Sequence, residues 1–101
     1  MKFLCTWKIH EDKRMDALGV FSQMTAADDK AEMGEDLTMI GRWHNLANFT
    51  GAAIIESDNA AAVGAWALNW APICNIDVVP VLDDEETRAV GRQALTAQAA
   101  G

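Results

Sequence analysis

The stretch Leu37–Glu56, LTMIGRWHNLANFTGAAIIE, decides the fold. It predicts a strand that includes Ile40-Gly41-Arg42-Trp43-His44, a turn at Leu46-Ala47-Asn48, and a second strand over Thr50–Glu56. Side chains alternate between the two faces of a strand. The first strand is therefore expected to place Met39, Gly41 and Trp43 on an apolar face, and Ile40, Arg42 and His44 on the opposite face.

Outward from this hairpin, the N-terminal segment Lys2–His10 alternates apolar and polar residues, which predicts another strand. Acidic residues then open a helix of about Asp12 to Met24, with Met15, Leu18 and Phe21 at helical spacing. The charged segment Ala26–Glu35 has no clear period and is interpreted as a loop, with room for one helical turn.

After the hairpin, Ser57-Asp58-Asn59 supplies N-cap residues for a second helix, which Pro72 ends. Its apolar stripe consists of Val63, Trp66, Ala67 and Trp70. Cys74–Leu82 predicts the last strand, and an Ala- and Gln-rich tail with helical propensity follows it. We therefore expect one α+β domain over residues 1–86 and a partly helical tail over 87–101.

The predicted order is β-α-β-β-α-β. Right-handed crossovers place the third strand between the first and second, which gives an antiparallel sheet of order 4-1-3-2. Pro80 supports this order, because proline cannot donate a ladder hydrogen bond and the last strand is then an edge.

The composition excludes several classes of function. A chain of 101 residues with a formal net charge of −7 lacks the basic surface that nucleic acids and anionic membranes require. Without a signal peptide or an apolar run long enough to span a bilayer, a cytoplasmic protein is expected. Cys5 and Cys74 are too few for a disulfide framework, so reduced and buried thiols are expected.

If the helices cover one face of the sheet, the other face still carries many apolar residues among its polar ones: Leu4, Ile40, Ile54, Val79 and Val81. Such a mixed open face needs a partner. The economical partner is a second copy, so a homodimer with its sheets face to face is expected.

Four segments together carry a family resemblance: Met1-Lys2-Phe3-x-x-Thr6-Trp7, Gly41-Arg42-Trp43-His44, Ala65-Trp66-Ala67-Leu68-x-Trp70, and Pro80-Val81-Leu82-Asp83-Asp84-Glu85. On these residues, about Met1–Glu86 resembles the uncharacterised domain family numbered 3303. The resemblance implies a ferredoxin-like fold of the dimeric α/β-barrel group and no established activity. The chain departs from the family in lacking prolines at the first helix and in its added tail.

The candidate site lies on the predicted open face, near the hairpin. Arg42 could hold a carboxylate or phosphate, and His44 could act as a general base or ligand anchor. The remaining candidates are Lys8, Asp77, His10 and Asn75. Each has a structural alternative: an interface histidine for His44, an ion pair with Glu56 or Asp77 for Arg42, and a cross-strand pair for Lys8 and Asp77.

No phosphate loop, Cys-x-x-Cys motif or nucleophile elbow is present, and neither a cofactor nor a metal site is predicted. The leading hypothesis is a dimer that binds a small anionic or carbonyl-bearing molecule, with Arg42 and His44 as its main contacts. One alternative is a non-catalytic structural or stress-related dimer. Another, by analogy of fold alone, is a cofactor-free monooxygenase-like or isomerase-like enzyme.

Overall fold

A four-stranded antiparallel sheet forms the body of the protein. The computed structural model describes residues 1–100, and its strands are β1 (Lys2–Ile9), β2 (Thr38–Asn45), β3 (Thr50–Glu56) and β4 (Cys74–Val81). Their order across the sheet is β2-β3-β1-β4, which is the predicted 4-1-3-2 read from the other edge. Pro80 lies in the edge strand β4, so the predicted topology is confirmed.

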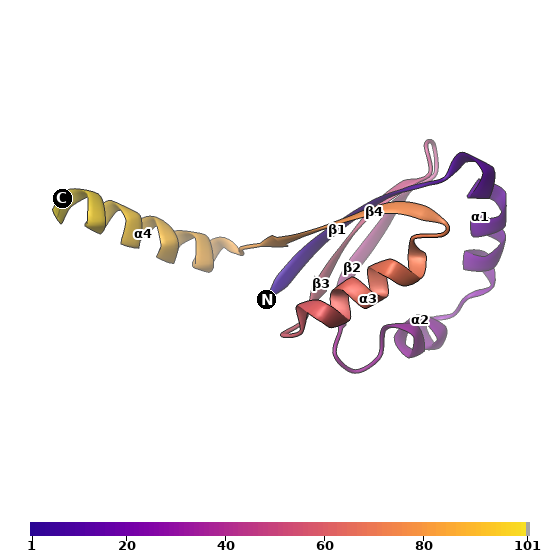
Figure 1. Ribbon diagram of the computed structural model, residues 1–101, viewed down its shortest axis with the longest axis horizontal. Helices are drawn as coiled ribbons and strands as arrows, with labels where there is room; N and C mark the ends of the chain where they lie inside the picture. Colours follow the sequence, from indigo (N-terminus) through magenta and orange to yellow (C-terminus); the bar gives the residue numbers. More distant parts are fainter. Residues whose placement is uncertain (101) are drawn as a thin grey trace.

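The helices are α1 (Arg14–Gln23), α2 (Ala26–Met33), α3 (Ala60–Trp70) and α4 (Asp84–Ala100), and the 3-10 turn η1 (Glu11–Lys13) precedes α1. Figure 1 shows α3 running across one face of the sheet, while α1 and α2 lie beside one of its ends. The helix α4 projects from the opposite end. Among the described residues, no helix has the length and apolar character needed to cross a membrane.

The segment predicted as a loop between α1 and β2 is mostly helix. Thr25 and Asp28 form a capping box at the start of α2: the Thr25 N–H donates to Asp28 Oδ2 at 2.9 Å, and the Asp28 N–H donates to Thr25 Oγ1 at 3.3 Å. This reciprocal cap satisfies backbone donors that a helix start otherwise leaves unpaired. It stabilises a short helix that has no buried residue and little periodicity.

The hydrophobic core lies between the sheet and α3. The predicted stripe of α3 supplies its buried Val63 and Trp66, and Asn59 caps the helix by accepting from the Ala62 N–H at 3.1 Å. The buried apolar residues are Phe3, Cys5, Leu37, Ala53, Ile55, Val63, Trp66 and Cys74. Helix α1 contributes no buried residue, and Met15 of its predicted core stripe is 72% exposed.

Strand β2 contains one residue more than the segment of β3 that it pairs with. Met39 pairs with Ile55 and Gly41 pairs with Ile54, so Ile40 lies between them as a β-bulge. Because side chains alternate along a strand, one extra residue reverses the facing of every residue after it. The bulge therefore decides which side chains of β2 face the helices.

The prediction that Arg42 and His44 lie on the open face is wrong. Arg42 pairs with Ala53, which is fully buried, and His44 pairs with Gly51, which itself pairs with Trp7 of β1. Both side chains therefore face the helices. The predicted alternation was continued through Ile40, and the bulge interrupts it at that residue.

Two glycines make room for two tryptophans on opposite sides of the sheet. A Cβ on Gly41 would collide with the indole of Trp43, which is 62% exposed on the open face, where it was not expected. A Cβ on Gly51 would collide with the indole of Trp7 on the helix side and would lie 2.8 Å from the Trp43 carbonyl oxygen. The absence of side chains at these positions lets both rings lie flat against the sheet.

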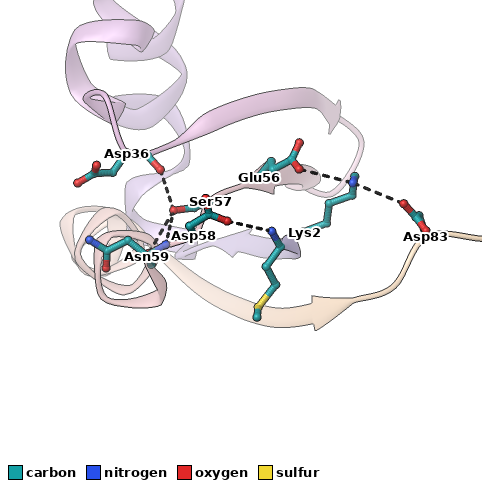
Figure 2. Close-up of polar contacts among 8 residues, drawn as sticks. Lys2, Asp36, Glu56, Ser57, Asp58, Asn59 and Asp83 are labelled. Carbon is teal, nitrogen blue, oxygen red and sulfur yellow. Dashed lines mark hydrogen bonds and ion pairs between the residues drawn. The ribbon is translucent and has the colours of Figure 1, made fainter. Parts of the chain in front are cut away.

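Polar contacts hold the other end of the sheet together (Figure 2). The buried Ser57 hydroxyl donates to the Asp36 carbonyl at 2.7 Å, which joins the start of α3 to the segment before β2. Lys2 Nζ lies 3.7 Å from Glu56 Oε1 and 3.7 Å from Asp83 Oδ2. Lys2 therefore links β1 to the end of β3 and to the residue that precedes α4.

Helix α4 stands clear of the body of the protein. None of its residues, 84–100, is buried, and Val90 and Leu95 are exposed. It begins with a second capping box, in which the Glu86 N–H donates to Asp83 Oδ1 at 2.8 Å and the Asp83 N–H donates to Glu86 Oε1 at 3.1 Å. Local capping thus accounts for the start of a helix that no tertiary packing supports.

Candidate functional site

A pocket of about 530 Å³ opens between the helix side of the sheet, α1 and α3. Its walls are mainly aromatic, and they include Trp7, Phe21, Phe49, Trp66 and Trp70. Arg42 and His44 also border it, and their side chains face the helices. Small-molecule sites typically combine such an apolar lining with a few convergent polar groups.

Arg42 is held in place from two directions. Its Nη2 atom lies 3.1 Å from Oδ2 of Asp29 in α2, and its Cζ atom lies 4.9 Å from the centre of the Phe21 ring in α1. The ion pair is partly buried, with 15% of the Arg42 side chain exposed. A guanidinium offers five N–H donors, and this ion pair engages only one of its nitrogens.

His44 sits among aromatic rings. Its imidazole centre lies 4.9 Å from that of Phe21 and 5.8 Å from that of Trp7, with the Trp7 ring inclined at 64°. Burial lowers the pKa of His44 below its ordinary value of 6.5, and the positive charge of Arg42 lowers it further, while Asp29 acts in the opposite direction. The imidazole is therefore neutral at pH 7, with one ring nitrogen able to accept a proton.

Glu32 of α2 lies close enough to Arg42 for the two charges to interact. Burial raises the pKa of its carboxyl above the ordinary 4.5, whereas the nearby indole N–H of Trp70 and the charge of Arg42 lower it. The Trp70 N–H approaches this carboxylate without forming a hydrogen bond of regular geometry. The guanidinium thus interacts with two carboxylates of α2: it forms an ion pair with Asp29, and its charge acts on Glu32.

The predicted site residues do not form one cluster. Lys8 lies opposite Thr50 and Asn75, and Asp77 lies opposite Thr6, so these polar side chains share the open face of the sheet. His10 lies beyond the end of β1, where its Nε2 atom is 3.1 Å from the Ala71 carbonyl oxygen. The predicted set is thus divided: Lys8, Asn75 and Asp77 lie together on the open face, and Arg42 and His44 lie together on the helix side of the sheet.

Residues 1–95 match the family described as Domain of unknown function (DUF3303). The chain belongs to this family. The match confirms the resemblance found in the sequence and extends it into α4. None of the curated proteins compared with the chain matches it.

Several residues of the site in this DUF3303 chain were missed by sequence reasoning. Asp29 fell in the segment interpreted as a loop, although the Thr25-x-x-Asp28 spacing is a capping-box signal that predicts the helix carrying it. Trp66 and Trp70 were recognised as an apolar stripe, but their spacing does not distinguish a filled core from a pocket wall. Phe21 was likewise placed in the core, whereas it borders the pocket.

The two thiols of this DUF3303 chain are free and buried. Burial raises the pKa of Cys5 to about 11 and also raises that of Cys74. The Cys74 Sγ atom lies 3.4 Å from the Trp70 carbonyl oxygen, to which the thiol donates. Within residues 1–100, no three His, Cys, Asp or Glu side chains are grouped as metal ligands.

Proposed function

We propose that the protein binds a small carbonyl-bearing molecule in the pocket between the sheet, α1 and α3. The observation that carries the proposal is the pairing of Arg42 and His44 at an otherwise apolar cavity of about 530 Å³. Pockets of roughly 300–1,000 Å³ suit small ligands, and a few placed polar groups fix their orientation. The aromatic walls supply contact area, while the guanidinium and imidazole supply directional contacts.

The charges around Arg42 favour a neutral ligand over an anion. Its guanidinium is already paired with Asp29 at 3.1 Å, and Glu32 lies nearby. A ligand carboxylate would have to compete with these two acidic side chains, and the neutral His44 would not add a positive charge. A carbonyl oxygen needs only a hydrogen-bond donor, which the remaining guanidinium N–H groups provide.

Ligand-induced thermal shifts test this proposal. A panel of neutral cyclic ketones and the matching carboxylates should separate the two ligand classes, with ketones raising the Tm of the parent protein. The shift should fall in His44→Ala and in Arg42→Ala, because binding to the folded state alone stabilises it. His10→Ala is the matched control, since this second histidine lies outside the pocket lining.

Intrinsic fluorescence gives an independent reading of the same binding event, because three of the four tryptophans, Trp7, Trp66 and Trp70, border the pocket from the helix side of the sheet. A bound ketone should quench their emission in a saturable way. Shifts that survive in both pocket variants, or an absence of shift and quenching across the panel, would rule out this ligand class. The non-catalytic structural alternative would then be favoured.

We also infer that the open face of the sheet is the contact between two copies of the chain. Ile40, Trp43 and Val79 are 54%, 62% and 43% exposed on that face. They lie beside polar residues on the same side of the sheet, among them Lys8 and Asp77. An isologous contact would cover these apolar side chains on both copies at once.

The oligomeric state in solution tests the dimer. Analytical ultracentrifugation of the full chain should give a dimer, and Val79→Asp should weaken its association at least about tenfold, since the contact would then bury an unpaired charge on each copy. Leu68→Asp is the control, because Leu68 is apolar and 72% exposed but lies on α3. A parent protein that stays monomeric at high micromolar concentration would refute the interface.

A further inference from the structure

Arg42 and His44 both border the pocket, and the strand that carries them, β2, fixes the distance between their backbone positions. They lie two residues apart on the same side of β2, so their Cα atoms are roughly 7 Å apart. Both side chains also contact the ring of Phe21, with the guanidinium carbon and the imidazole centre each 4.9 Å from its centroid. This shared contact directs the two groups to the same part of the pocket.

The arrangement suits a carbonyl group and its neighbouring carbon. Because both groups contact the Phe21 ring, one ligand can present its carbonyl oxygen to the guanidinium and the adjacent C–H to the imidazole. The imidazole is the only side chain lining the pocket that is neutral at pH 7 and has a basic ring nitrogen, within the described residues. Arg42 stays protonated and can only donate.

We propose that the protein catalyses proton transfer at the carbon next to a carbonyl group, with His44 as the base and Arg42 as the donor to the carbonyl oxygen. This activity rests on the proposed binding function and names the chemistry of the same pocket. Its substrates are neutral ring compounds with an enolisable ketone.

The electron flow is balanced without a cofactor. The lone pair of an imidazole nitrogen takes the proton, the C–H electron pair forms the carbon–carbon double bond of the enolate, and the carbonyl π pair moves to oxygen. The oxyanion then accepts hydrogen bonds from the Arg42 guanidinium, whose side chain is only 15% exposed, and a partly desolvated donor stabilises developing charge more than a fully solvated one does. The imidazolium then returns the proton. Return to the same carbon exchanges the hydrogen, whereas return to a conjugated carbon farther along isomerises the substrate.

The neighbours of the two groups assist this step. Asp29 holds Arg42 through the 3.1 Å ion pair and acts as a positioning residue. Trp7 and Phe21 flank the imidazole and orient it, while part of its surface remains exposed. The charged side chains that act on His44 are Arg42 from its own strand and Asp29 from α2, and they have opposite effects on its charge.

Deuterium exchange into 2-tetralone provides the test. The full-length protein is incubated with this ketone in D₂O, and proton NMR follows the loss of the signal at the carbon between ring and carbonyl. We expect exchange about 10²-fold faster than with free imidazole at the same concentration and pH, because a positioned general base contributes about this much. The exchange rate should rise with pH through a pKa below 6.5 and then level off.

Two histidine variants make the test specific. His44→Gln should lose the acceleration even at saturating 2-tetralone, with saturation judged by quenching of tryptophan emission. His10→Gln should retain both the acceleration and the quenching, since His10 lies outside the pocket lining. Added imidazole should restore part of the rate in His44→Gly, which a purely structural role of His44 would not allow.

The outcomes separate this inference from the proposal it rests on. Saturable quenching by 2-tetralone with exchange no faster than free imidazole would overturn the catalysis and leave the binding function standing. Equal exchange rates in the parent and His44→Gln would do the same. The absence of quenching by 2-tetralone and by related cyclic ketones would overturn both.

Discussion

Nη2 of Arg42 lies 3.1 Å from Oδ2 of Asp29, and this ion pair joins α2 to strand β2 at the edge of the pocket. The second carboxylate oxygen of Asp29 is buried without a hydrogen-bond partner. Since α2 has no buried residue, its attachment to the sheet depends heavily on such polar contacts.

Replacing Asp29 with Asn should lower the free energy of unfolding by about 1–3 kcal/mol, because the Arg42 charge would remain partly buried without its counter-ion. Urea denaturation of the parent and Asp29→Asn proteins measures the difference. The matched control is Glu85→Gln, which removes an exposed ion pair with Arg88 on α4 and should change stability very little. Equal effects of the two substitutions would contradict a structural role for the Arg42–Asp29 pair.

Gly51→Ala should destabilise the protein by about 1–3 kcal/mol, because a Cβ there collides with the Trp7 indole and approaches the Trp43 carbonyl oxygen. The Trp43 carbonyl belongs to the backbone of β2, so it cannot move aside as the end of a flexible side chain can. Gly64→Ala in α3 is the control: its Cβ meets nothing within 4 Å, and alanine should raise the stability by up to about 1 kcal/mol. Thermal unfolding of both variants checks the opposite signs.

The stability of the protein should fall as the pH drops from 7 into the window below 6.5. Burial and then Arg42 lower the pKa of His44 in the folded state. Between that lowered pKa and 6.5, the unfolded chain binds more protons than the folded one, so the free energy of unfolding rises with pH there. Below the lowered pKa, His44 contributes no further change.

His44→Gln should flatten this dependence when Tm is measured against pH, whereas His10→Gln should leave its shape intact. A parent whose Tm is constant from pH 5.5 to pH 7.5 would show that His44 titrates as it does in the unfolded chain. Such a result would also remove the physical basis for a neutral, proton-accepting imidazole in the pocket.

Both cysteines should react only slowly with a thiol reagent at pH 8 while the protein is folded. Cys5 is fully buried, with a pKa raised to about 11, and Cys74 is also buried. Mass spectrometry of peptides from timed labelling should show Cys74 modified before Cys5, because Cys74 borders the pocket. A ligand in the pocket should slow the labelling of Cys74 alone. Both thiols should react at once in guanidinium chloride.

The fold could be predicted because period-two strands, N-cap residues and Pro80 all indicate one topology. The alternation of Phe3, Cys5 and Trp7 and the stripe of Val63 and Trp66 correctly identify the two surfaces that pack into the core. Helix α2 was missed because its stability comes from a cap and an ion pair, and neither produces an apolar period.

The candidate site could be predicted only in part. Arg42 and His44 were correctly grouped, because residues two apart in a strand share a face wherever that face points. The face of the sheet to which they were assigned was wrong, since the bulge at Ile40 leaves no distinct pattern in the amino-acid sequence. Lys8 and Asp77 were grouped with them on the assumption of an unbroken alternation, and the register places these two on the opposite side.

The extra residue at Ile40 is the one position of β2 without a partner in β3. Loss of its codon would make the pairing regular, while Met39, Gly41 and Arg42 would keep Ile55, Ile54 and Ala53 as partners, so the guanidinium and imidazole would still face the helices. A three-nucleotide deletion at this codon should therefore spare the polar groups of the cavity, whereas a deletion between Arg42 and the turn would shift every later pair of the hairpin.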